Sequence, residues 1–133
     1  MPEKNNKPRK ILIVDDDQFL LEMYSIKFRE AGILVEELLD SKKALQYLRE
    51  KNDIDVLILD VVMPEIDGLT ILKKVRTERL ANDPVVIMLS NQGQESDIHK
   101  AKELGADGYI IKASSVPSEV LDSVLRIYSE KKK

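Results

Sequence analysis

Several runs of branched apolar residues in this sequence are followed at once by side chains that can do chemistry. An uninterrupted apolar run of four or five residues is typical of a strand that is buried on both faces. The residues that follow such runs are Asp15 with Asp16, Asp60, Ser90 and Lys112. Because the carboxyl ends of parallel strands meet at one edge of a sheet, where open α/β sheets bind ligands, we expect these side chains to lie close together.

Asp60 follows the most informative of these runs. Residues 56–59 have no polar interruption, and Met63-Pro64 and Asp67-Gly68 come soon afterwards. Both pairs favour a loop, because Pro fixes φ and Gly tolerates the positive φ of a tight turn. The pattern therefore predicts that Asp60 stands at the carboxyl end of a central strand. The alternative, an Asp that only caps a loop, leaves the matching chemistry after the other runs unexplained.

The gathered residue types favour a metal ion and a phosphoryl group. Three carboxylates at one edge repel one another by roughly 4 kcal/mol per close pair at an effective dielectric constant of about 20. A divalent cation relieves this repulsion at neutral pH, and oxygen ligands without His or Cys favour Mg²⁺. Lys112 could neutralise an anion and Ser90 could donate a hydroxyl hydrogen bond to it, as phosphoryl transfer to a carboxylate requires. A charge network that ties loops together would explain each of these residues singly, but explains all of them together poorly.

The elements that must position these residues alternate between strands and helices. Apolar runs predict strands at 10–14, 33–38, 55–59, 85–89 and 108–111. Helical spacing predicts helices at about 18–31, 41–52, 69–79 and 95–104, and a last helix from about Pro117. Asp17 is expected to be the N-cap of the first helix, and Gly32 and Gly105 are expected to end the first and fourth. Five strands alternating with five helices predict an α/β fold, with a parallel sheet covered on both faces.

Length and composition predict one domain in a reducing compartment. The chain has 133 residues, a net charge of −3 and no Cys. We expect residues 1–8 to be a flexible basic tail, 9–130 the domain, and 131–133 a second basic tail. The slightly acidic balance argues weakly against nucleic-acid binding. No apolar run is long enough to span a membrane, so we expect a cytoplasmic protein without membrane insertion.

These motifs, in this order, resemble the receiver domain of two-component response regulators. The matching segments are Ile-Leu-Ile-Val-Asp-Asp, Leu-Asp-x-x-Met-Pro-x-x-Asp-Gly, the Ser after the fourth strand, and Gly-Ala-Asp-Gly-Tyr-Ile-Ile-Lys. The resemblance covers about residues 9–130. It implies a flavodoxin-like, doubly wound fold with strand order 2-1-3-4-5.

The resemblance implies a phosphoacceptor switch rather than an enzyme. Asp60 would accept a phosphoryl group from a histidine kinase or histidine phosphotransferase. Asp16, Asp60 and the backbone carbonyl of Val62 would bind Mg²⁺, and Asp15 would act through a water molecule. Lys112 would hold the phosphoryl oxygens.

The resemblance also implies an output. Ser90 would hold the phosphoryl oxygens with Lys112, and Ser90 and Tyr109 would form a switch, although Tyr109 could equally be an ordinary half-buried strand aromatic. The fourth helix, fifth strand and fifth helix would form the face that meets a downstream protein, without direct contact to nucleic acid. Because no output domain follows in the sequence, we expect the single-domain form.

The sequence departs from the family pattern after Lys112 and after Asp60. The family usually has a Pro with a cis bond where this chain has Ala113. We expect the Lys112–Ala113 bond to be cis nonetheless, so that Lys112 can reach the phosphoryl group, although a non-proline cis bond costs about 2.5–4 kcal/mol. Val62 and Gln92 flank the route of the hydrolytic water, and an apolar Val62 cannot orient that water. We therefore expect slow self-dephosphorylation.

The sequence also has to be compared with what three alternative functions would require. A phosphorylation-independent adaptor is possible because of Ala113. A phosphatase of the haloacid dehalogenase type would need a second Asp two residues after the nucleophile, where this chain has Val62. A flavodoxin-type flavin carrier would need a Ser-, Thr- or Gly-rich loop after the first strand, where this chain has three aspartates.

Overall fold

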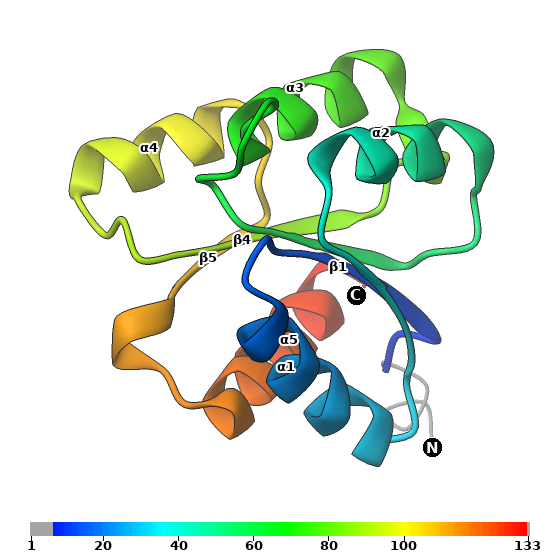
Figure 1. Ribbon diagram of the computed structural model, residues 1–133, viewed down its shortest axis with the longest axis vertical. Coiled ribbons are helices and arrows are strands. Elements are labelled where there is room, and N and C mark those ends of the chain that lie inside the picture. Colours follow the sequence, from blue (N-terminus) through cyan, green and yellow to red (C-terminus); the bar gives the residue numbers. More distant parts are fainter. Residues whose placement is uncertain (1–6, 133) are drawn as a thin grey trace.

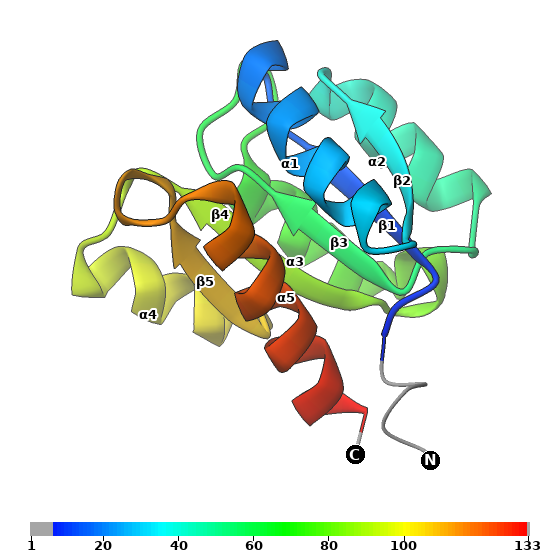
Figure 2. The ribbon, with the colours of Figure 1, turned by 90° about the horizontal axis from the view of Figure 1, so that it is seen from below.

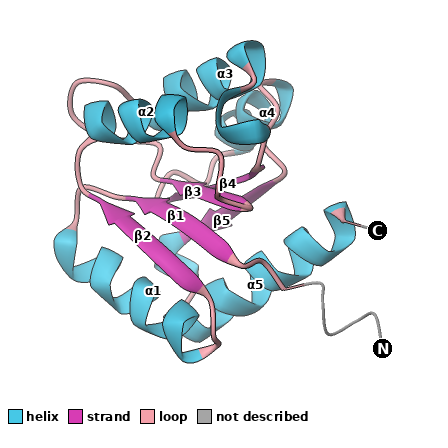
Figure 3. Ribbon diagram, turned by 90° about the vertical axis from the view of Figure 1, so that its right-hand side faces the viewer, coloured by secondary structure: helices cyan, strands magenta, loops and turns pink. Residues whose placement is uncertain are grey.

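The computed structural model describes residues 7–132 and has three layers, a sheet between two layers of helices (Figures 1 and 3). The five strands are β1 (Lys10–Val14), β2 (Leu34–Leu38), β3 (Val56–Leu59), β4 (Val85–Ser90) and β5 (Gly108–Ile111). The five α-helices are α1 (Gln18–Glu30), α2 (Ser41–Glu50), α3 (Gly68–Glu78), α4 (Glu95–Glu103) and α5 (Pro117–Lys131). All paired strands are parallel, and their order is β2-β1-β3-β4-β5, which confirms the predicted fold class and strand order.

The central strands are apolar throughout because both of their faces are covered. In β3, Val56 and Ile58 pack in the core under α1 and α5, whereas Leu57 and Leu59 pack in the core under α2, α3 and α4. All four are at most 1% exposed. Figure 2 shows α1 and α5 side by side over one face, and Figure 1 shows α2, α3 and α4 on the other. The sheet edge that holds the candidate residues is therefore supported from both sides.

Acidic side chains start the helices next to the candidate site. Asp17 accepts a hydrogen bond from the Leu20 amide at 3.1 Å, which confirms its predicted role as the N-cap of α1. Asp67 accepts from the Thr70 amide at 2.8 Å and is the N-cap of α3. From the sequence, Asp67 was expected only to favour a turn. These caps fix where each helix leaves the strand-end loops.

Gly68 lies where the loop after Asp60 returns to the sheet. A Cβ at this position would lie 2.1 Å from the backbone oxygen of Asp60, which is far inside van der Waals contact. The Gly68 amide donates to the Val61 carbonyl at 2.8 Å. Gly68 is therefore required by close packing, and its φ is not among the positive values.

The Lys112–Ala113 bond is trans, so the expectation of a cis bond was wrong. No peptide bond within residues 7–132 is cis. After β5 the chain forms a short 3₁₀ turn, Lys112–Ser114, closed by the Ser115 amide on the Lys112 carbonyl at 3.2 Å. This turn carries Lys112 to the sheet edge with ordinary trans geometry, which costs less than a non-proline cis bond.

The two ends of the described chain are attached to the domain. Lys7 donates a hydrogen bond to the Ala31 carbonyl at 2.7 Å, and Pro8 is buried. At the other end, Lys131 lies 3.1 Å from Asp107. The rest of the predicted tails, residues 1–6 and 133, lies outside the described residues. Within residues 7–132, no helix has the length and apolar character needed to cross a bilayer.

Candidate functional site

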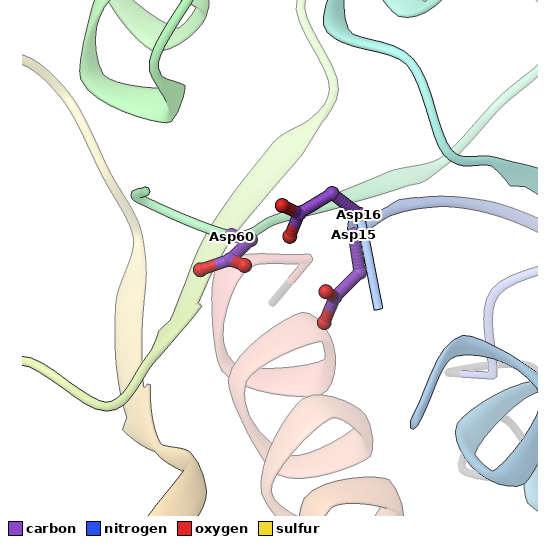
Figure 4. A group of neighbouring side chains, drawn as sticks. All are labelled: Asp15, Asp16 and Asp60. Carbon is purple, nitrogen blue, oxygen red and sulfur yellow. The ribbon is translucent and has the colours of Figure 1, made fainter. Parts of the chain in front are cut away.

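Three carboxylates gather at the carboxyl ends of β1 and β3. Asp15 follows β1 and is 1% exposed, Asp16 is exposed, and Asp60 follows β3 and is 7% exposed. One oxygen of each carboxylate lies within 4.8 Å of the other two. Figure 4 shows the three side chains around one shared space. The structure thus brings these predicted residues together.

Lys112 reaches the same place from the end of β5. Its ammonium nitrogen lies 2.7 Å from Asp15 Oδ2 and 3.1 Å from Asp60 Oδ2, and its side chain is 8% exposed. Three carboxylates and one ammonium leave a net charge of −2 when all are ionised. One divalent cation would neutralise that charge.

The Asp15 carboxylate is held in place but is not fully satisfied. Its Oδ1 accepts a hydrogen bond from the Asp17 amide at 2.9 Å. Its Oδ2 is buried and, within residues 7–132, has the Lys112 ammonium at 2.7 Å as its one partner. A carboxylate oxygen can accept more than one partner, so this oxygen keeps a lone pair for a further positive ligand. The site therefore fits a hard cation that takes oxygen ligands, as Mg²⁺ does.

Burial raises the pKa of Asp60 to about 6. The Lys112 cation lowers this pKa and the Asp15 carboxylate raises it, but both effects are smaller than that of burial. Burial also lowers the pKa of the Lys112 ammonium, but hydrogen bonding and attraction to Asp15 and Asp60 outweigh burial, so the pKa rises overall. At neutral pH the site therefore holds a charged lysine beside an ionised but poorly solvated carboxylate.

Ser90 and Tyr109 meet through the backbone of Gln92. The Gln92 amide donates to Ser90 Oγ at 3.0 Å, and the Tyr109 hydroxyl donates to the Gln92 carbonyl. Ser90 is 1% exposed at the end of β4, between β3 and β5. It makes no hydrogen bond to Asp60 or Lys112 within the described part of the chain. The predicted switch pair is therefore adjacent, and both side chains bond to the backbone of Gln92.

Val62 lies at the rim of the site, where its side chain is 56% exposed. Its amide lies 3.4 Å from Asp60 Oδ1, which is a long hydrogen bond. Gln92, the other residue expected beside the route of the hydrolytic water, is also exposed. His99, which lies on α4, is exposed and pairs with Glu103 at 3.2 Å.

Ser41 is a site neighbour that the sequence analysis did not single out. It lies in the first turn of α2, yet its hydroxyl contacts the loop that follows Asp60, more than twenty residues away. A helix-start serine is common at such positions for local reasons. Its sequence context therefore carried no signal of this long-range contact.

Comparison with known proteins identifies the family. Residues 11–124 match the model of the response regulator receiver domain. The response regulator SaeR of Staphylococcus aureus is 35% identical over 123 residues, which are 92% of this chain and 52% of SaeR. The chain thus spans about half the length of the curated relatives it matches.

Solved structures agree with this match. The receiver domain of a Francisella response regulator is 30% identical, with a TM-score of 0.82 over 94% of this chain and 99% of that domain. The chemotaxis response regulator CheY4 of Vibrio cholerae is 30% identical, with a TM-score of 0.80 over 89% of this chain and 97% of CheY4. Taken with the sheet order and the acidic site, these matches show that the chain belongs to the family of response regulator receiver domains.

Proposed function

We propose that Asp60 accepts a phosphoryl group and that this modification switches a protein-binding face of the domain. The observation that carries the proposal is the position of Lys112, whose ammonium joins two buried strand-end carboxylates, Asp15 and Asp60, beside a third, Asp16. Such a site can bind a divalent cation and neutralise an incoming phosphoryl group, and these two tasks are most of the catalysis that phosphoryl transfer needs.

The residues around Asp60 have separate roles in this proposal. Asp16, Asp60 and the Val62 carbonyl hold Mg²⁺, and Asp15 supports it through water. Bound there, Mg²⁺ supplies positive charge to the phosphoryl oxygens. An Asp60 carboxylate oxygen forms the bond to phosphorus while the bond from phosphorus to the donor breaks, and the donor keeps that electron pair. Lys112 then leaves the Asp60 oxygen that becomes bonded and pairs with a phosphoryl oxygen.

The switch in this proposal runs from Ser90 to α4. In the unphosphorylated structure the Gln92 amide donates to Ser90 Oγ. When Ser90 turns to donate its hydroxyl hydrogen to a phosphoryl oxygen, the Gln92 backbone adjusts to the new position of Oγ. The Gln92 carbonyl accepts from Tyr109, so the tyrosine adjusts with it. Only Ala101 of α4 is buried, which leaves that helix weakly held beside β5. The face of α4, β5 and α5 is therefore the proposed site for a downstream protein.

The proposed phosphoryl donor is a histidine kinase or a histidine phosphotransferase, in the cytoplasm. Support comes from the family match and from the site itself. His99, the one histidine of the chain, is an exposed residue of α4 paired with Glu103 rather than with an acidic residue of the site. We propose that the donor histidine therefore belongs to another protein.

The alternative functions have less support from the geometry. The adaptor hypothesis depended on Ala113, but Lys112 lies 3.1 Å from Asp60 without a proline after it. The dehalogenase-type phosphatase needs an acid two residues after the nucleophile, where the exposed side chain is that of Val62. The phosphoacceptor role of Asp60 is therefore the proposed function, and each alternative predicts a different outcome of the test below.

The test is incubation with acetyl phosphate and Mg²⁺, followed by intact mass measurement. We expect one added phosphoryl group that survives acid and is lost in base, that requires the metal, and that is absent from Asp60→Asn. An unmodified wild-type protein would contradict the proposal and favour the adaptor. Steady turnover of phosphate esters without a modified protein would favour the phosphatase.

A further inference from the structure

Ser41 joins the start of α2 to the loop between β3 and α3. Its hydroxyl donates to the Pro64 carbonyl at 3.0 Å and accepts from the Ile66 amide at 3.3 Å. The residue is 3% exposed, so water does not compete freely for these bonds. Asp40, not Ser41, is the N-cap of α2, because Asp40 Oδ1 accepts from the Lys42 and Lys43 amides. The Ser41 hydroxyl is therefore free of helix capping and serves the neighbouring loop.

The loop that Ser41 contacts is strained. The Ile66 amide also donates to the Pro64 carbonyl at 2.8 Å, so three residues close a tight turn. Its central residue, Glu65, has a φ of 70° without being glycine, and that left-handed conformation is costly for an L-residue. Such a turn persists only where the surroundings hold it. Ser41 contacts both ends of the turn, and the nearby Lys42 ammonium lies 3.7 Å from the Glu65 carboxylate.

The same loop carries the atoms of the phosphoacceptor site. It begins at Asp60, continues through Val62, and returns at Gly68, whose amide donates to the Val61 carbonyl at 2.8 Å. The strained turn at Pro64–Ile66 lies between these points. Gly68 packs so closely against the Asp60 backbone that a Cβ would not fit there. Residues 61–63, which include the Val62 carbonyl, therefore lie between two held points, the Asp60 backbone and the turn that Ser41 contacts.

We propose that Ser41 is a positioning residue for the metal site, which holds the Pro64–Ile66 turn so that the Val62 carbonyl faces the carboxylates. The inference rests on the proposed function, because it assigns the Val62 carbonyl to Mg²⁺. It predicts that the Ser41 hydroxyl sets the affinity for Mg²⁺ and leaves the rate of phosphorylation at saturating Mg²⁺ nearly unchanged.

The experiment compares Ser41→Ala with wild type and with two other variants. Ser41→Thr keeps the hydroxyl, and a cavity of about 140 Å³ beside Ser41 and Pro64 can take its extra methyl group. Ser25→Ala is the control, because Ser25 is also a buried serine whose hydroxyl bonds to the backbone, in its case once, to the Leu21 carbonyl, but it lies on α1, on the opposite face of the sheet. The measurements are Mg²⁺ titration by calorimetry, hydrogen exchange of the Ile66 amide without metal, and the Mg²⁺ dependence of acetyl phosphate labelling.

For Ser41→Ala we expect the dissociation constant for Mg²⁺ to rise roughly three- to tenfold, the range for one ordinary hydrogen bond, because only part of the loss of the two Ser41 bonds is passed to the metal site through the turn. The Ile66 amide should exchange faster, Ser41→Thr should restore both values, and Ser25→Ala should change neither. The labelling rate at saturating Mg²⁺ should stay within about twofold of wild type.

A second background tests the strain itself. Glu65→Gly removes the cost of the positive φ, so the turn should depend less on Ser41. The effect of Ser41→Ala on Mg²⁺ affinity should then shrink to less than half of its size in the Glu65 background. Glu65→Gln, which keeps the strain but loses the charge, should leave the effect intact.

The results separate this inference from the proposed function. Wild-type affinity for Mg²⁺ and wild-type exchange of Ile66 in Ser41→Ala would overturn the inference, as would equal effects of Ser41→Ala and Ser25→Ala. A wild-type protein that is not labelled on Asp60 would overturn the proposed function, while the effect of Ser41 on Mg²⁺ binding and on Ile66 could still be present.

Discussion

The buried surroundings of Asp60 oppose its ionisation, although its carboxylate is ionised at neutral pH. Burial raises its pKa to about 6, from 3.8 for a free Asp side chain. Between these two pH values the folded protein holds a proton that the unfolded chain has released. The free energy of unfolding therefore falls as the pH rises through this window, and stays lower above it.

This shift gives a prediction for Asp60→Asn in the absence of metal. At pH 7 the variant should be more stable than wild type by on the order of 1–2 kcal/mol, because it removes a poorly solvated charge. Near pH 3.5 the difference should largely vanish, since Asp60 is then mostly protonated in both the folded and the unfolded wild-type chain. Urea unfolding of both proteins at both pH values measures this difference in the free energy of unfolding. Saturating Mg²⁺ should stabilise wild type but not the variant, and equal stability at pH 7 without metal would contradict the account.

The Val62 side chain is expected to affect the lifetime of the phosphorylated protein. This exposed apolar side chain lies where a polar group could orient a water molecule toward Asp60. Val62→Asn should shorten the lifetime of the phosphorylated protein by roughly tenfold, which is less than a general acid or base contributes, because an amide orients the water molecule without taking its proton. The decay of the intact phosphorylated mass measures this. A lifetime that is unchanged or longer would count against slow self-dephosphorylation through Val62.

Among the helices, α4 is the one that the core holds least. Four residues are buried in each of α1, α2, α3 and α5, but only Ala101 is buried in α4. The Gln94 side chain at the start of α4 makes no capping hydrogen bond, whereas acidic side chains cap α1, α2 and α3. Few buried contacts and a weak start lower the cost of local opening. This is the helix that the proposed switch has to move.

We therefore predict that the amides of α4 exchange fastest among the helices. In the unphosphorylated protein, protection in 95–103 should be at least about tenfold lower than in the middle of α1, consistent with sub-global opening. Hydrogen exchange followed by mass spectrometry measures both helices in one sample, and α1 is the internal control. Protection of α4 equal to that of α1 would show that this helix is not the mobile element.

At the scale of elements, local sequence signals predicted most of what was observed. Gly32 and Gly105 both have positive φ and follow α1 and α4, where the sequence placed helix ends. Asp17 is the N-cap as expected. The 3₁₀ turn Leu80–Asn82 was not predicted, because Arg79 and Ala81 adopt left-handed φ values that their residue types do not indicate. Arg76 of α3 bonds to Asp83 and to the Pro84 carbonyl just after this segment.

The residues of the candidate site likewise fall into those that the sequence predicted and those that it did not. Asp15, Asp16, Asp60 and Lys112 could be predicted because each ends an apolar run, and parallel topology alone brings strand ends together. The trans bond at Ala113 is the default for a non-proline residue, and the expectation of a cis bond came from the family pattern rather than from this sequence. The contacts of Ser41 could not be predicted, because they depend on how loops from different strands pack, and a single sequence does not encode that in any short pattern.

At the scale of the whole molecule, Arg76 links several loop segments at the edge of the sheet opposite the candidate site. Its side chain is 21% exposed, and the guanidinium donates to the Gly105 and Pro84 carbonyls and pairs with Asp83 and Asp107. Asp107 also accepts from the Val86 amide at 2.9 Å. One residue of α3 therefore holds the segments that lead into β4 and β5, the two strands that carry Ser90 and Lys112.

Arg76→Ala should consequently lower the free energy of unfolding by about 2–3 kcal/mol, because it leaves partly buried acceptors without donors. Arg76→Lys should recover little, since an ammonium cannot bridge these acceptors as a planar guanidinium does. Arg49→Ala is the control: its exposed pair with Glu78, at 3.7 Å, should contribute less than about 1 kcal/mol. Chemical denaturation measures all three. Similar losses for Arg76→Ala and Arg49→Ala would contradict this role.

The central claim is that one carboxylate of this chain, Asp60, is the phosphoryl acceptor. Its most direct test is to label the protein with acetyl phosphate and Mg²⁺, trap the acyl phosphate by borohydride reduction, and locate the reduced residue by peptide mapping. The account predicts reduction at residue 60 alone, and none when Mg²⁺ is chelated. Reduction at Asp15, at Asp16 or at an acid elsewhere in the chain, with Asp60 unmodified, would contradict it.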